Sequence, residues 1–102
     1  MMHKALLVLD VGATNVKACL VDPAGLVLAS FSMHNETVPD PEFSGGRVWD
    51  TDDIWAKLGK CCRQAVAAAG DVELAGVTVT TFGVDGAFMR ADGSLGYPVI
   101  SW

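Results

Sequence analysis

The sequence is poor in basic residues, with seven lysines and arginines against twelve acidic residues in 102 and a formal net charge of −5. A nucleic-acid-binding surface needs basic side chains to neutralise phosphates, so this charge argues against a nucleic-acid partner. Long apolar runs are also missing. No segment approaches the ~20 residues of a membrane span, and the apolar run after Lys4 is too short for a signal peptide. We therefore expect a cytoplasmic protein with no membrane partner.

Cysteine is scarce as well, at three residues, and the spacing fits neither a disulfide framework nor a metal site. Cys61 and Cys62 are adjacent, and Cys19 lies apart from both. No CxxC pair or cluster with histidine occurs. We expect buried or half-buried thiols in a reducing compartment. Apolar residues make up 51% of the chain, which is enough for the core of one domain.

The first third of the sequence predicts an antiparallel meander. Apolar and β-branched residues favour strands over residues 5–9, 15–21 and 26–33, with a tight turn at Pro23-Ala24-Gly25. Residues 34–48 contain prolines and glycines without periodicity, which predicts a surface loop that can end in a short strand over residues 47–49.

A helix and a return strand follow. Asp50 is suited to cap a helix whose apolar face recurs every three or four residues and which ends at Gly70. The β-branched stretch 74–80 then predicts a strand parallel to the first, because a helix separates the two. The Asp92-Gly93 turn predicts a closing hairpin with strands over residues 87–90 and 95–100. The expected class is α/β, in the order β-β-β-α-β followed by a β-hairpin.

The turn between the first two strands combines the chemical groups that a phosphate and its magnesium ion require. Gly12 can adopt a positive φ and allows a ligand to approach the backbone, while Thr14 and Asn15 add donors. Lys17 can neutralise a phosphate oxygen, and Asp10 becomes useful if Mg²⁺, directly or through water, lies between it and the phosphate. The alternative is a plain hairpin, since Gly, Asn and Asp are ordinary turn residues.

A second candidate site follows the return strand. Asp85 lies in the loop Gly83-Val84-Asp85-Gly86, at the strand end where ligands of α/β sheets gather. A carboxylate there can accept hydrogen bonds from two sugar hydroxyls, although a simple turn aspartate is the alternative. Trp102 can line the same cleft or fill core. Trp49 and Trp55 are expected to pack in the core or at its rim.

The stretch LDVGATNVKACLVD resembles the first phosphate motif of the FGGY carbohydrate kinases, a family of the actin-like ATPase superfamily. VTVTTFGVDGAFM and the closing YPVISW are most similar to the members of the family that act on L-fuculose, with the rhamnulose kinases close behind. The resemblance runs over essentially the whole chain.

The resemblance implies a ribonuclease-H-like fold and phosphoryl transfer from ATP, with Mg²⁺, to a sugar hydroxyl. It implies that Asp10 organises the magnesium, and that the phosphates are surrounded by Gly12, Thr14, Asn15 and Lys17. It places Asp85, with Gly83 and Trp102 beside it, at the ketose. L-Fuculose would give its 1-phosphate, and L-rhamnulose or another ketose is the alternative substrate.

Family members are several times longer than this chain, and their catalytic base lies far downstream. We therefore expect residues 1–102 to be the N-terminal part of the first kinase domain, without a catalytic residue and inactive alone. Such a piece should self-associate through its unpaired strand edges. A non-enzymatic phosphate- or sugar-binding module and a structural remnant of a kinase are the alternatives.

Overall fold

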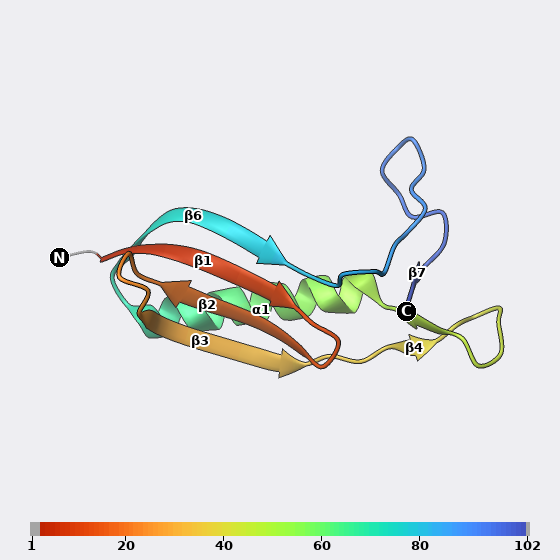
Figure 1. Ribbon diagram of the computed structural model, residues 1–102, viewed down its shortest axis with the longest axis horizontal. Coiled ribbons are helices and arrows are strands. Elements are labelled where there is room, and N and C mark those ends of the chain that lie inside the picture. The colour runs from red at the N-terminus through yellow and green to blue at the C-terminus, as the bar shows by residue number, and fades with distance from the viewer. Residues whose placement is uncertain (1–2, 102) are drawn as a thin grey trace.

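A four-stranded sheet with one long helix on one face forms the body of the protein, as the computed structural model describes it for residues 3–101 (Figure 1). The strands are β1 (His3–Val11), β2 (Asn15–Val21), β3 (Val27–His34) and β6 (Val72–Thr80), in the order β3-β2-β1-β6. The first three pair antiparallel, which confirms the predicted meander. β6 lies parallel to β1, as the intervening helix predicted.

The helix α1 (Thr51–Ala69) begins and ends where the sequence indicated. The Asp50 side chain accepts a hydrogen bond from the backbone N–H of Asp53 at 3.1 Å, which satisfies one of the free donors of the first turn. Gly70 ends the helix with φ of 76°, a conformation that residues with a side chain rarely adopt. None of the helices in residues 3–101 is long and apolar enough to cross a membrane.

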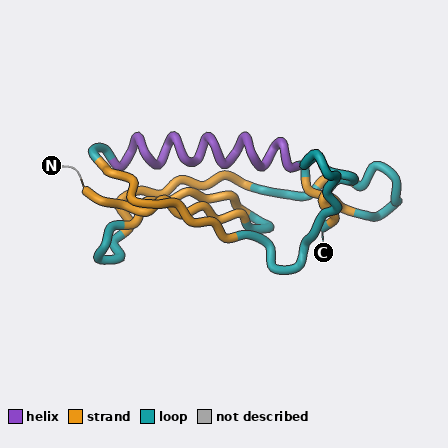
Figure 2. Tube along the Cα trace, turned by 90° about the horizontal axis from the view of Figure 1, so that it is seen from above, coloured by secondary structure: helices purple, strands orange, loops and turns teal. Residues whose placement is uncertain are grey.

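The core lies between α1 and the sheet (Figure 2). Alternate residues of β1 and β2 point toward the helix, and they meet two small residues on its buried face. The core residues are Ala5, Leu7, Val11, Val16, Ala18, Leu20, Cys61 and Ala65. The three cysteines are free thiols, as expected, and the Cys61 Sγ–H donates to the Val16 carbonyl at 3.6 Å. Burial raises the pKa of the Cys61 and Cys62 thiols, which makes both less reactive.

A small second sheet lies beyond the carboxyl end of β1, at the far end of the elongated molecule (Figures 1 and 2). It consists of β4 (Val38–Pro39), β5 (Arg47–Trp49) and β7 (Val99–Ile100), in the antiparallel order β4-β5-β7. The short strand over residues 47–49 was predicted, but β4 was not, because two residues ending in proline carry no strand pattern.

The predicted closing hairpin was only partly right. A tight turn forms at Asp92-Gly93, with Gly93 at φ of 88°, and a single bridge joins Met89 to Leu95. The strands predicted on either side do not extend further. Instead Val99 and Ile100 pair with β5. Pro98 has no N–H to donate, so a continuous strand over residues 95–100 would lack one of its ladder hydrogen bonds.

Candidate functional site

The turn between β1 and β2 is tightly closed. The Gly12 N–H donates to the Asn15 carbonyl at 2.8 Å, and a Cβ built on Gly12 would lie 3.3 Å from that oxygen. A side chain at position 12 would therefore require the Asn15 carbonyl to shift by a few tenths of an ångström. The positive φ suggested for Gly12 was wrong, since among residues 3–101 positive φ occurs only at Gly25, Gly45, Gly70 and Gly93.

Asp10 and Lys17 lie directly opposite each other in the β1–β2 ladder. Their side chains share one face of the sheet, because opposite residues of an antiparallel pair do so. Val11 and Val16, the next pair along, are buried toward α1, so Asp10 and Lys17 lie on the face away from the helix. Within residues 3–101 neither side chain forms an ion pair.

The donor set at this turn fits a magnesium ion bound to phosphates. Mg²⁺ is commonly held by one or two carboxylates together with phosphate oxygens and water, and Asp10 supplies one carboxylate beside the turn. Residues 3–101 contain no cluster of three or more histidine, cysteine or acidic side chains that would form an all-protein metal site.

Asn35 also holds this turn, through two hydrogen bonds that no sequence pattern indicated. This residue follows the last residue of β3 and is 1% exposed. Its backbone N–H donates to the Thr14 carbonyl at 2.8 Å, and its side-chain Nδ2 donates to the Gly12 carbonyl at 2.9 Å. The contact joins residues more than twenty positions apart, which no local pattern reveals. Figure 1 shows the β1–β2 turn beside the chain as it leaves β3.

Asp85 lies in the loop that follows β6, the strand parallel to β1. Thr80, the last residue of β6, pairs with Asp10, so the phosphate motif and the Asp85 loop leave the same edge of the sheet. The sequence suggested an open carboxylate between glycines. Asp85 is instead half-buried, and its Oδ2 accepts a hydrogen bond from the Trp49 indole N–H at 2.6 Å.

Trp49 is buried at 3% exposure, which confirms its predicted packing role, whereas the same prediction was wrong for Trp55, which is 77% exposed on α1. The Trp49 ring stacks on Phe82, with 4.4 Å between the centroids and 16° between the planes. Sequence reasoning missed the second role of Trp49 as hydrogen-bond donor to Asp85. The only available signal was a tryptophan at the end of a short strand, which does not name a partner thirty-six residues away.

A pocket of about 350 Å³ opens beside Asp85, between the ends of β1 and β6 and the start of α1. Its lining includes Val11, Trp49, Thr51, Phe82, Asp85 and Gly86. The structure thus places Asp85 in the lining of a pocket. Gly83 does not line this pocket: it is exposed, and a Cβ added to it would have no atom within 4 Å. Trp102, also expected at this cleft, lies outside the described residues.

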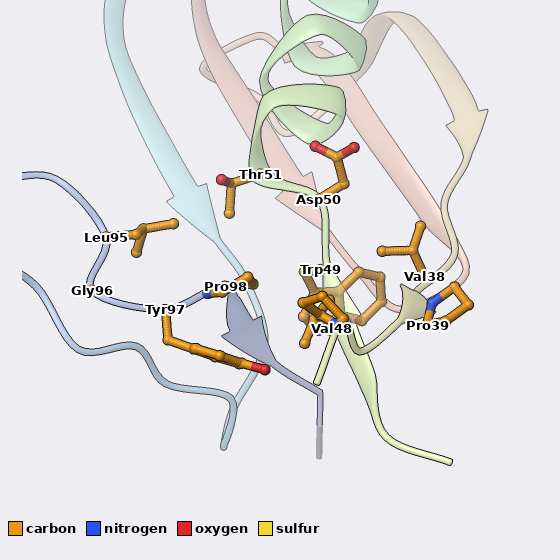
Figure 3. Close-up of a pocket in the computed structure, with 11 residues that line it drawn as sticks. Val38, Pro39, Val48, Trp49, Asp50, Thr51, Leu95, Gly96, Tyr97 and Pro98 are labelled. Carbon is orange, nitrogen blue, oxygen red and sulfur yellow. The ribbon is translucent and has the colours of Figure 1, made fainter. Parts of the chain in front are cut away.

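A larger pocket of about 530 Å³ shares Trp49 and Thr51 with the first and lies between β4, β5 and residues 95–98 (Figure 3). The Tyr97 hydroxyl, from the lining of this pocket, donates to the Asp40 carboxylate, which joins the 95–98 segment to the loop before β5. This bond lowers the pKa of Asp40 and raises the pKa of Tyr97 to about 12. No residue from the phosphate motif lines this pocket.

The fold and the two motifs define a class of protein. The chain belongs to the FGGY family of carbohydrate kinases, whose N-terminal domain matches residues 5–102.

The chain is also similar to individual members of this family, all of them L-fuculokinases. The chain is 45% identical to an L-fuculokinase of Salmonella typhi and 40% identical to one of Escherichia coli K12, over all 102 residues in each case. It is 37% identical over 101 residues to an L-fuculokinase of Haemophilus influenzae. The chain spans 22% of the length of each of these relatives.

Solved structures confirm the fold. A xylulose kinase from Rhodospirillum rubrum matches 94% of this chain with a TM-score of 0.80 at 22% identity, and the match covers 20% of that protein. A glycerol kinase from Plasmodium falciparum, solved with ADP, matches 99% of this chain with a TM-score of 0.80 at 17% identity and 21% of its own length. The predicted α/β, actin-like ATPase fold is therefore confirmed, as an incomplete domain.

Proposed function

We propose that this chain is part of an ATP-dependent sugar kinase that converts L-fuculose to L-fuculose 1-phosphate. The observation that carries the proposal is the placement of the phosphate motif and the Asp85 loop at one edge of the sheet, where Asp10 pairs with Thr80 across β1 and β6. The identity of 37–45% to L-fuculokinases over the chain supports L-fuculose as the substrate, with L-rhamnulose the alternative.

In this proposal the β1–β2 turn binds the phosphates of ATP. The N–H groups of Ala13 and Thr14 form no hydrogen bond within residues 3–101, so both can donate to phosphate oxygens. The ammonium group of Lys17 balances phosphate charge, and Thr14 and Asn15 add side-chain donors. Asp10 would hold Mg²⁺, directly or through water, and the ion would neutralise charge on the phosphates when bound.

Asp85 binds the sugar, and Trp49 fixes the orientation of its carboxylate. The primary hydroxyl oxygen of the ketose attacks the γ-phosphorus, the bond from that phosphorus to ADP breaks, and the hydroxyl proton passes to a base. We assign that base to no residue of this chain, because the catalytic base of the family is expected downstream and Asp85 is assigned to sugar binding. Gly83 and Trp102 complete the proposed sugar side. The free thiols are in keeping with a cytoplasmic location.

The test is an ATP-consumption assay on the protein encoded by the complete reading frame that contains these residues. L-Fuculose, L-rhamnulose and xylulose serve as acceptors. We expect L-fuculose to give the highest kcat/KM, and Asp85→Asn to raise its KM without a comparable change in the KM for ATP. A protein that hydrolyses ATP equally with and without every sugar would contradict the proposal. The 102-residue chain alone is expected to show no turnover.

A further inference from the structure

Asn35 is the only buried polar side chain among residues 3–101. It lies outside both sequence motifs, at the point where the chain leaves β3. Polar side chains are rarely placed in a core without a purpose, because burial removes their hydrogen bonds to water. What Asn35 contacts therefore indicates what it is for.

Both hydrogen bonds of Asn35 go to the phosphate motif. Nδ2 donates to the Gly12 carbonyl at 2.9 Å, and the backbone N–H donates to the Thr14 carbonyl at 2.8 Å. These carbonyls lie on either side of Ala13, at the tip of the turn. Asn35 thus holds the tip at two points from one side.

The hydrogen bond from Asn35 to the Gly12 carbonyl determines the direction in which the Ala13 N–H points. The Gly12 carbonyl and the Ala13 N–H belong to one peptide unit, and the peptide bonds of the described chain are all trans. The two groups of a trans peptide point in opposite directions. Because the carbonyl is turned toward Asn35, the Ala13 N–H is turned away from it, and that N–H forms no hydrogen bond within residues 3–101.

We propose that Asn35 is a positioning residue, whose carboxamide holds the Gly12 peptide so that the Ala13 N–H faces a phosphate group of the bound nucleotide. The proposal rests on the proposed function, since it concerns the same phosphate site. Holding the donor in place before binding avoids the entropy cost of ordering a turn around the ligand.

The remaining atom of the side chain supports this role. Asn35 Oδ1 is buried and has no hydrogen-bond partner among residues 3–101. An unsatisfied buried acceptor weakens folding, so this oxygen adds nothing to stability. The contribution of the side chain therefore lies in the Nδ2 donor that it supplies to the Gly12 carbonyl.

Two substitutions in the protein from the complete reading frame separate positioning from charge. Asn35→Leu is close in size and removes the donor without adding charge. Asn35→Asp also removes the donor, and it places a carboxylate against the Gly12 carbonyl. Gln64→Leu is the matched control, since Gln64 is an exposed amide on α1. ADP binding is measured by calorimetry, the KM for L-fuculose by the kinetic assay, and folding by thermal unfolding.

Loss of one hydrogen bond predicts that Asn35→Leu binds ADP about 5- to 10-fold more weakly, with the KM for L-fuculose changed less than about twofold. Asn35→Asp should weaken ADP binding further, and Gln64→Leu should not change it. If Asn35→Leu does not fold, Asn35→Ala carries the same comparison, because alanine also lacks a side-chain donor.

Unchanged ADP affinity in a folded Asn35→Leu or Asn35→Ala protein would overturn the inference. So would a loss confined to Asn35→Asp, because that result would reflect charge and not position. If the wild-type protein neither binds ADP nor phosphorylates a sugar, it is the proposed function that fails.

Discussion

The hydrogen bond from Trp49 to Asp85 predicts that the indole N–H of a buried tryptophan affects sugar binding. Trp49→Phe removes the indole N–H but keeps an aromatic ring that can stack on Phe82. The Asp85 carboxylate then loses the donor that holds its Oδ2. Its orientation toward the sugar hydroxyls is then held less firmly.

The expected increase in the KM for L-fuculose follows from the strength of the hydrogen bond between Trp49 and Asp85. A hydrogen bond to a charged group contributes about 1.5–3 kcal/mol. Asp85 is only half-buried, so water can replace part of the lost interaction. If roughly 1 kcal/mol of it orients the carboxylate for the sugar, the KM for L-fuculose should rise about fivefold. The KM for ATP should stay near the wild-type value.

The assay is steady-state kinetics of the protein from the complete reading frame, with each substrate varied in turn. Trp55→Phe is the matched control, because Trp55 lies on α1 with 77% exposure and should leave both KM values unchanged. The smaller ring of Trp49→Phe also lowers Tm through lost packing. A lower Tm with an unchanged KM for L-fuculose would refute the reasoning and leave Trp49 as a core residue only.

Three further predictions concern stability and assembly. Gly59→Ala should stabilise the 102-residue chain by about 0.5–1 kcal/mol, because alanine favours a helix and the added Cβ meets only the flexible Arg63 side chain; a lower denaturation midpoint would contradict this. The pKa of Tyr97 is raised to about 12 against an ordinary 10, so its hydrogen bond to Asp40 stabilises the fold below pH 10, and this stabilisation is lost as the pH rises through 12. Tyr97→Phe should therefore lose less stability than the wild-type protein between pH 10 and 12. An identical loss in both proteins would count against the hydrogen bond. The 102-residue chain should self-associate through the exposed apolar face of β6, where Val77 is 60% exposed; sedimentation should show larger species that Val77→Lys reduces, and a concentration-independent monomer would be the opposite result.

The parts of the fold that depend on local patterns could be predicted from the sequence. Apolar and β-branched stretches marked the three strands of the meander, and the Asp50 and Gly70 caps marked the helix ends. A helix between two strands was enough to predict that β6 runs parallel to β1. The closing hairpin failed because pairing with β5, a distant strand, competed with the local turn.

The candidate site, like the fold, could be predicted only where it depends on local sequence. The phosphate motif is contiguous, so its residues could be named, and the strand order explains why it lies near the Asp85 loop. The residues that support it could not be named. Asn35 and Trp49 act through contacts to Gly12 and Asp85 that span 23 and 36 positions, and neither belongs to a motif. One sequence contains no signal for such pairs until the chain is folded.

The central claim, that this chain belongs to a kinase that phosphorylates a ketose, is tested most directly by identifying the product. The protein from the complete reading frame is incubated with ATP, Mg²⁺ and L-fuculose, and the mixture is followed by ³¹P NMR. We predict a new phosphate monoester whose phosphorus couples to the two protons of the C1 methylene group, with one ADP formed for each ester. ADP that appears only with inorganic phosphate, or no consumption of ATP, would contradict the account.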